Sequence, residues 1–375
     1  MGEIIGAQTI LANGLPTGVD GDRLAKWQMR DGRTWKQHVS ALAVVLAAKN
    51  QAFINKWGDL LAITDDIMVE YEQGGSVTKS NKISDLSDIK ATSGETIGHM
   101  IDFAPYAEAV GGTWMYFRDG RPAKFNSDIA TSVRKMEWRL EYELLNRFFV
   151  NTEVAVGSAG YNVPFVRGTG GNVDYAPPAF AGEAFATSHD HFIGYDSGSK
   201  TMVDVLNGLA ETLIEHGHEA PFTAMVSKTD VDAGTFHALT DFTRLISGVQ
   251  IDRGGASSGN QFFAGGQFAL EGTIGYFQSR YGQITLRMST RIPTGYVGMY
   301  KSYGVRDQRN PLWVRVHPEV GFGMRIVTET SNDMQWPLKQ VNFISEFGVG
   351  VGQDRTNGAV GLLVSGGTYA NATIG

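Results

Sequence analysis

The chain contains no cysteine among its 375 residues. It therefore cannot form a disulfide, and no metal site in it can use thiolate ligands. Its longest continuous apolar run, Ala41 to Ala48, is far shorter than the roughly 20 residues that span a lipid bilayer. The residues after Met1 lack the basic start and long apolar run of a secretory signal. These absences predict a protein without a membrane partner that folds in a reducing cytoplasm.

Positive charge is also scarce, since 32 Lys and Arg residues stand against 39 Asp and Glu residues, for a formal net charge of −7. A protein that grips nucleic acid through its phosphates more often presents a basic face. The composition fits a protein that lies near DNA without clamping it.

Glycine is abundant, with 47 residues spread along the chain rather than arranged in a repeat. This usage predicts many tight turns and long β segments. Hydrophobic residues make up 42% and charged residues 19%, which is typical of a globular chain. The length allows two domains or one large elaborated domain.

The stretch from Asn126 to Val150 has the apolar spacing of a long amphipathic helix. Ser127 is expected to cap its first turn, and Asp128 lies where the helix dipole favours an acid. A second apolar row widens the stripe, so the helix requires a large partner surface. The residues of the main stripe are Ile129, Val133, Met136, Leu140, Leu144 and Phe148.

Before this helix, the pattern predicts an irregular arm over residues 1–34 and a helix from Trp35 to about Trp57. Leu60 to Tyr71 fits a short helix or a strand. Gly74 to Arg121 reads as a long two-stranded excursion with little core of its own. Such a segment suits a chain that lies on a neighbouring subunit.

After the helix, Val156 to Gly182 is rich in Gly and Pro and predicts a loop between two lobes. The second lobe is expected to open with a helix over Thr201 to His216 and a short buried strand over Pro221 to Val226. A further helix, capped by Ser227 or Thr229, should run to about Leu239. From Phe262 onward the pattern is mostly β.

Two motifs point weakly to chemistry. Gly194 to Thr201, GYDSGSKT, ends like a phosphate-binding P-loop, but Ser199 stands where that motif needs glycine and no buried strand is expected before it. The pairs His189/His191 and His216/His218 could bind a metal, but they match no known ligand spacing and are expected to be solvated.

Gly348 to Gly352, GVGVG, lacks a dinucleotide fingerprint and predicts a turn or bulge. No G-x-S-x-G elbow and no distinguished pair of carboxylates is present. We therefore expect no catalytic residue, no cofactor and no metal site, and hence a protein that is not an enzyme.

The order of these parts resembles the major capsid protein of tailed bacteriophages, whose fold was first named from a Hong Kong phage. NSDIATSVRKMEWRLEYELLNRFF is similar to the spine helix of that family, and residues 74–121 are similar to its extended loop. TMVDVLNGLAETLIEHGHEAPFTAMVSKTDVDAGTFHAL resembles the helix–strand–helix start of its axial domain.

The resemblance implies an α+β fold with an N-terminal arm, an extended β-loop, a peripheral domain with a long spine helix and an axial α/β domain. The implied segments are the arm (1–34), the N-terminal helix and a peripheral-domain segment (35–73), the extended loop (74–121), the spine helix (122–155), the axial domain (156–330), and the late peripheral strands with the C-terminal tail (331–375).

The resemblance also implies a function, which is self-assembly into hexamers and pentamers of an icosahedral shell around viral double-stranded DNA. The DNA would be enclosed without sequence-specific binding. Because no scaffolding segment precedes the arm, a separate scaffold protein is expected, with a portal and a cement protein as further candidate partners. Assembly would take place in the host cytoplasm and leave the chain in the virion capsid.

Intersubunit contacts are expected in the extended loop. Some members of the family crosslink a loop lysine to a neighbouring asparagine, but no acceptor can be matched here. The aromatic candidates follow from the weight that aromatic residues carry in interfaces. The residues expected to make these contacts are Tyr106, Trp114, Tyr116, Phe117, Lys79, Lys82 and Lys90.

Two alternatives remain open. A nanocompartment shell protein would use the same fold, and an α/β enzyme would use the histidine pairs or Ser199-Lys200-Thr201 as its metal or nucleotide site. A shell forms particles of megadalton mass, whereas an enzyme forms a small oligomer.

Overall fold

The structure is a computed structural model that describes residues 35–73, 95–113, 115–116, 122–158, 160–168, 175–181, 184–236, 239, 241–246, 249–251, 272–327 and 338–375. The chain divides into two compact units. Unit 1 comprises residues 1–54, 104–141 and 317–347, and unit 2 comprises residues 55–103, 142–316 and 348–375.

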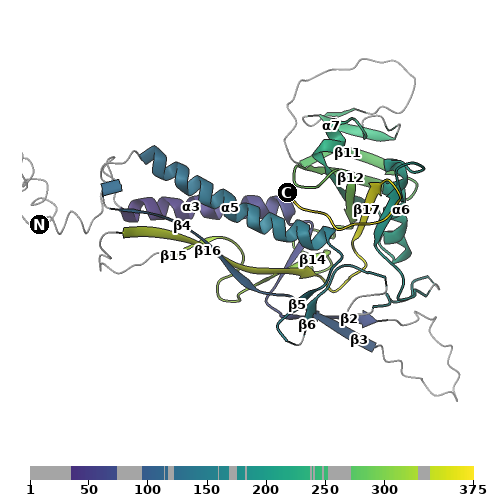
Figure 1. Cartoon of the computed structure of the whole chain (residues 1–375), viewed down its shortest axis with the longest axis horizontal. Coiled ribbons are helices and arrows are strands. Elements are labelled where there is room, and N and C mark those ends of the chain that lie inside the picture. The colour runs from purple at the N-terminus through teal and green to yellow at the C-terminus, as the bar shows by residue number, and fades with distance from the viewer. Residues whose placement is uncertain are drawn as a thin grey trace, which may run out of the picture. The chain divides into compact units, whose positions relative to one another are not determined.

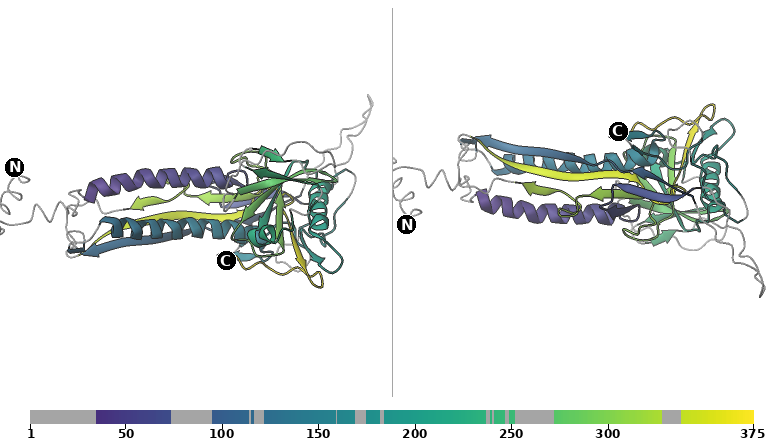
Figure 2. Two further views of the ribbon diagram at one scale, coloured as in Figure 1. Left: turned by 90° about the horizontal axis from the view of Figure 1, so that it is seen from above. Right: turned by 90° about the horizontal axis from the view of Figure 1, so that it is seen from below.

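Unit 1 combines two long helices with a sheet. Helices α3 (Trp35–Trp57) and α5 (Pro122–Phe149) run alongside strands β4 (Ala104–Thr113), β15 (Arg325–Val327) and β16 (Leu338–Val351) (Figures 1 and 2). Strand β16 pairs antiparallel with both β4 and β15, and its pairing with β4 extends over ten residues. Both helices continue into unit 2.

The N-terminal half of the predicted apolar stripe lies in the core of unit 1. Ile129, Val133 and Met136 of α5 are buried against Val110 of β4 and Phe343 of β16. The remaining members of this core are Leu46, Phe125, Met324 and Val341. The long helix and its buried face are therefore confirmed.

The predicted start of this helix is wrong. The helix begins at Pro122, because proline lacks the N–H that the first turn of a helix leaves unpaired. Ser127 lies one turn inside, where its carbonyl accepts a hydrogen bond of 2.9 Å from the Thr131 hydroxyl. At the other end, the buried Arg147 guanidinium donates to the carbonyls of Val150 and Thr152, just beyond the helix.

Unit 2 is built on an eight-stranded mixed sheet in the order β10-β9-β11-β12-β8-β13-β17-β7. Helix α6 (Met202–Glu215) buries Val205, Leu206, Leu209 and Leu213 in the core that this sheet shares with it. In chain order, the strands are β7 (Phe192–Asp196), β8 (Phe222–Ser227), β9 (Phe242–Ile246), β10 (Val249–Ile251), β11 (Gly272–Ser279), β12 (Gly282–Ser289), β13 (Tyr296–Tyr300) and β17 (Ala359–Val364).

Unit 2 contains further strands. Strand β1 (Leu61–Thr64) pairs parallel with β14 (Leu312–Val316), and both belong to the sheet that contains β16. Strand β2 (Met68–Gln73) pairs antiparallel with β3 (Glu95–Met100). Strands β5 (Val154–Val156) and β6 (Gly160–Asn162) form a short hairpin. The segment from Leu60 to Tyr71, expected to be a helix or a strand, therefore forms two strands.

The helices predicted at Trp35 and Thr201 are confirmed, and so is the strand predicted after Pro221. The backbone N–H of Thr201 donates to the Asp204 carboxylate, which fixes the start of α6. The helix capped by Ser227 is much shorter than predicted. Helix α7 spans only Lys228–Asp232, since the chain turns at Gly234, whose φ of +77° favours glycine.

Gly348 to Gly352 were expected to form a turn or a bulge, and the turn is wrong, because Gly348 to Val351 form the end of β16 and Gly352 directly follows it. A Cβ on Gly348 would lie 1.5 Å from the Asp102 carbonyl oxygen, and one on Gly350 would lie 2.6 Å from the Ile101 side chain. Gly348 thus allows close contact between two backbones, and Gly350 leaves room for the Ile101 side chain, which a sequence pattern of alternating glycines does not distinguish from a turn.

The segment predicted as an extended loop divides into different parts. Residues 74–94 lie outside the described residues, β3 pairs with β2, and β4 forms a sheet with β16. The expectation of little core is wrong for β4, whose Val110 is 6% exposed. In the C-terminal segment, β17 lies between β13 and β7 of the eight-stranded sheet. The domain boundaries themselves stay a prediction.

No helix in the described part of the chain has an apolar stretch long enough to cross a membrane.

Candidate functional site

Two of the predicted contact residues pack within their own chain. The Arg139 guanidinium lies over the Tyr106 ring, 4.5 Å from its centroid, and Phe347 lies 4.8 Å from that ring between centroids. The Tyr116 hydroxyl donates to the Asp128 carboxylate at 2.8 Å. Burial, reinforced by this hydrogen bond, raises the pKa of Tyr116 to about 12. Both rings thus join the region of β4 to α5, and a role between subunits stays a prediction.

The other predicted contact residues, Trp114, Phe117, Lys79, Lys82 and Lys90, lie outside the described residues.

In the turn that resembles a P-loop, the Asp196 carboxylate takes up backbone N–H groups that would otherwise be open to an anion. Strand β7 leads into it, paired with its parallel partner β17, although only Phe192 of this strand is buried, so the expectation of no buried strand before the motif is not contradicted. Asp196 Oδ1 accepts hydrogen bonds of 3.1 Å from the N–H groups of Gly198 and Gly366. These two bonds lower the pKa of Asp196. An anion at this turn would meet a negative charge instead of free backbone donors.

The fold brings the two histidine pairs together. His189 and His191 directly precede β7, and His216 and His218 directly follow α6. The Nε2 atom of His216 lies 2.9 Å from Nε2 of His189 and 3.0 Å from Nε2 of His191. One ligand atom from each of these three residues lies within 4.8 Å of the others. We refer to His189, His191 and His216 as the histidine cluster.

The expectation that these histidines are solvated is wrong. His191 is fully buried, His218 is 3% exposed, and the other two are half-buried. Burial lowers the pKa of His216 to about 3, and burial together with the neighbouring imidazoles lowers the pKa of His191 well below its usual value. The Phe185 ring covers the cluster, with its centroid 4.2 Å from that of His216.

His218 does not join the cluster. Its Nδ1 atom lies 3.0 Å from the Tyr303 hydroxyl, and its Nε2 atom lies 3.0 Å from the Thr356 hydroxyl. Asp354 accepts hydrogen bonds from Thr356 and lies 3.4 Å from His218 Nε2. His218 is thus a partner of the loop that follows β16.

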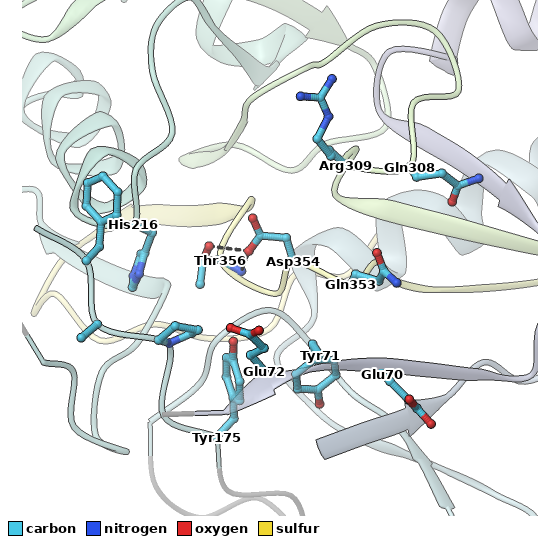
Figure 3. A pocket seen from close by; sticks show the side chains of 13 residues that line it. Glu70, Tyr71, Glu72, Tyr175, His216, Gln308, Arg309, Gln353, Asp354 and Thr356 are labelled. Atoms are coloured by element: carbon cyan, nitrogen blue, oxygen red, sulfur yellow. Dashed lines mark hydrogen bonds between the residues drawn. The ribbon is translucent and has the colours of Figure 1, made fainter. Parts of the chain in front are cut away.

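A pocket of about 480 Å³ lies beside the cluster. Figure 3 shows His216 at one side of the pocket, Thr356 and Asp354 near its middle, and Tyr175, Glu72 and Tyr71 along the opposite wall. Every labelled side chain carries a polar group. The pocket therefore offers space for water or a small polar ligand beside His216.

A buried arginine supports one wall of this pocket. Arg355 is 1% exposed, and its guanidinium donates to the Tyr71 hydroxyl and the Pro164 carbonyl at 3.1 Å and to the Phe165 carbonyl at 3.4 Å. The Tyr175 ring lies 4.6 Å from its central carbon. Neutral oxygens and ring faces thus satisfy the charge, and they hold both tyrosines in place.

No protein-family model and no curated protein matches the chain. Among solved structures, a chain from Mycobacterium phage Patience is 22% identical, with a TM-score of 0.57 and 91% of each chain covered. The chain has the fold of that phage protein. The predicted α+β class is thereby confirmed.

Two other solved structures are similar over most of the chain. The capsid of Cyanophage P-SCSP1u is 9% identical, with a TM-score of 0.45 and coverage of 82% of this chain and 88% of that one. An encapsulin complex from Synechococcus elongatus is 14% identical, with a TM-score of 0.42 and coverage of 83% and 88%.

Proposed function

We propose that the chain is a major capsid protein that assembles into an icosahedral shell around viral double-stranded DNA. The observation that carries the proposal is the shared fold with the phage protein, which extends over 91% of both chains. Its role is structural, without a catalytic step, and its place is the virion capsid after assembly in the host cytoplasm.

One face of α3 supports self-assembly. Val44 and Val45 are 71% and 50% exposed, and Ala41 and Ala48 on the same side of the helix are exposed as well. Leu46 on the opposite side is buried in the core of unit 1. An apolar helix face left in water favours association, so we propose that it contacts other copies of the chain.

The remaining partners follow from the same proposal. Hexamers and pentamers of the chain form the shell, a separate scaffold protein guides their assembly, and a portal and a cement protein complete it. The net charge of −7 suits a wall that encloses DNA without binding it tightly.

The test is to express the full chain alone and together with a candidate scaffold protein, and to examine both by sedimentation and negative-stain electron microscopy. We expect closed, uniform particles of megadalton mass. Only small oligomers in both samples would contradict a shell. Closed particles that carry a protein cargo in place of DNA would indicate a nanocompartment.

A matched pair of variants tests the helix face. Val44→Asp places a charge on the exposed apolar side of α3 and should abolish or strongly reduce particle formation, with the circular dichroism spectrum unchanged. Val305→Asp makes the same change at a 68% exposed valine in a loop of unit 2 and serves as the control. Normal particles from Val44→Asp would remove this face from the assembly contacts.

A further inference from the structure

The contacts within the histidine cluster cannot both be full hydrogen bonds. In the imidazole plane, one ring nitrogen either donates one proton or accepts one. His216 Nε2 lies at hydrogen-bonding distance from two other Nε2 atoms, so its single proton or its single lone pair has to serve both contacts. Sharing one proton or one lone pair in this way leaves each contact weaker than a full hydrogen bond. A cation that accepts all three lone pairs removes this conflict.

The orientation of His191 prepares its Nε2 atom for such a cation. Its Nδ1 atom lies 2.7 Å from the Gly358 carbonyl oxygen, which can only accept, so Nδ1 carries the proton. The neutral ring therefore presents a bare lone pair at Nε2. A carbonyl that holds the outer nitrogen of a histidine in this way is common at metal sites.

We propose that His189, His191 and His216 bind a divalent transition-metal ion, Zn²⁺ in the first place, through their Nε2 atoms. Metal–nitrogen bonds of about 2.0–2.1 Å with tetrahedral angles separate two ligand nitrogens by about 3.3 Å. The separations of 2.9 and 3.0 Å reach this value after a small outward movement of the rings. The inference is independent of the proposed function.

The ligand set selects the class of ion. Three imidazoles suit Zn²⁺, Co²⁺, Ni²⁺ or Cu²⁺, whereas Mg²⁺ and Ca²⁺ prefer oxygen ligands. Three protein ligands leave a fourth position open. His216 also lines the pocket, so water from this pocket is the natural fourth ligand.

Nearby groups are engaged elsewhere. Both nitrogens of His218 lie at hydrogen-bonding distance from hydroxyl groups, and the Asp190 carboxylate accepts a hydrogen bond of 2.8 Å from the Phe192 N–H. The ion would join the segment before β7 to the end of α6. His191 and His216, one from each place, are 25 residues apart in the sequence. It would act as a cross-link in a chain without cysteine.

The first experiment is a titration of the full chain, stripped of metal with a chelator, with Co²⁺ as a coloured probe. We expect saturation at one equivalent, visible absorption bands of the intensity typical of tetrahedral coordination, and their loss when Zn²⁺ displaces Co²⁺. Saturating Zn²⁺ should also raise the thermal unfolding midpoint by at least about 2 °C.

Single variants test the ligands. His189→Gln and His216→Gln each remove one half-buried ligand and should lower the Zn²⁺ affinity by more than about tenfold. His317→Gln, at an exposed histidine outside the cluster, is the matched control and should keep the wild-type affinity. Wild-type affinity in both cluster variants would overturn the proposal, and so would the absence of stoichiometric binding in the wild type.

X-ray absorption spectroscopy of the wild-type zinc form provides a test that needs no variant. We expect three imidazole nitrogens at about 2.0–2.1 Å from the ion. Fewer than three imidazoles would overturn the proposal even if Zn²⁺ binds.

Discussion

The stripe of α5 and the wall of the pocket bury side chains of opposite character. Leu144 and Phe148 are completely buried among apolar neighbours. Arg355, which supports the wall, and His99, whose ring lies 5.5 Å from that of the wall residue Tyr71, are instead buried with their polar groups. The stripe stabilises the fold by removing apolar surface from water, and this effect depends little on the relative orientation of the side chains. The wall has to satisfy each polar atom at a defined angle, because an unsatisfied one costs more than its hydrogen bond contributes. The difference predicts that the stripe tolerates changes of shape and the wall does not.

The largest effect is expected from a cavity in the stripe. Phe148 lies 4.9 Å from Phe165 and 6.0 Å from Tyr300 between ring centroids, so Phe148→Ala should lower the free energy of unfolding by about 3–5 kcal/mol. Urea denaturation followed by circular dichroism measures the change. Arg134→Ala, on the exposed side of the same helix, is the control and should change this free energy by less than about 0.5 kcal/mol.

A conservative change in the wall should cost nearly as much. Arg355→Lys keeps the charge but cannot reach all three acceptor oxygens, so we expect a loss of about 2–3 kcal/mol. Leu144→Met, which nearly conserves volume at a fully buried site of the stripe, should cost less than about 1.5 kcal/mol. Equal losses in these two variants would contradict the contrast between the two regions.

Acid should weaken the wall through His99. Burial, followed by the Arg355 charge, lowers the pKa of His99 to about 3 in the folded chain, whereas an unfolded histidine has a pKa of about 6.5. As the pH falls below 6.5, the unfolded state takes up a proton that the folded state refuses, so this contribution to stability decreases from pH 6.5 down to about 3. Between pH 6.5 and 5 the loss is about 2 kcal/mol.

His99→Gln checks this contribution. Its side-chain amide can still donate to the Val351 carbonyl, which lies 3.0 Å from His99 Nε2, but it does not titrate. The difference between the variant and the wild type in unfolding free energy should therefore depend on pH in this window. An identical pH dependence in the two proteins would show that His99 is not responsible.

The smallest changes in stability are expected at two serines, Ser227, which caps a helix, and Ser127, which was only predicted to cap one. Ser227 accepts a hydrogen bond of 3.2 Å from the Thr229 N–H at the start of α7, so Ser227→Ala should cost about 1 kcal/mol. Ser127 lies inside α5, where alanine is the better helix former, so Ser127→Ala should change stability by less than about 0.5 kcal/mol in either direction. A larger loss at Ser127 would support the start of α5 expected from the sequence.

The sequence predicted the helices whose apolar residues recur at helical spacing. The stripe of α5 and the face of α6 repeat every three or four residues, so the sequence reveals both the helix and its buried side. The start of α5 was missed because Ser127 and Pro122 both fit a first turn, and only the contacts of Phe125 with the core favour the earlier one.

The histidine cluster was missed for a different reason. Each His-x-His pair is uninformative alone, and their meeting depends on the strand and helix between them, β7 and α6. The two pairs lie at the two ends of one strand–helix unit, which is the signal that could have suggested their approach. The burial of Arg355 has no such signal, since its partners come from segments distant in sequence.

The close contacts at Gly348 and Gly350 also determine how this chain can vary. Every substitution of a glycine adds at least a Cβ atom, and at these two positions that atom has no room beside residues 101 and 102. A library of random mutants selected for folding should therefore keep both codons nearly invariant. By contrast, Gly234, which has open space around it and a φ of +77°, should be limited only by backbone conformation and should accept asparagine or aspartate.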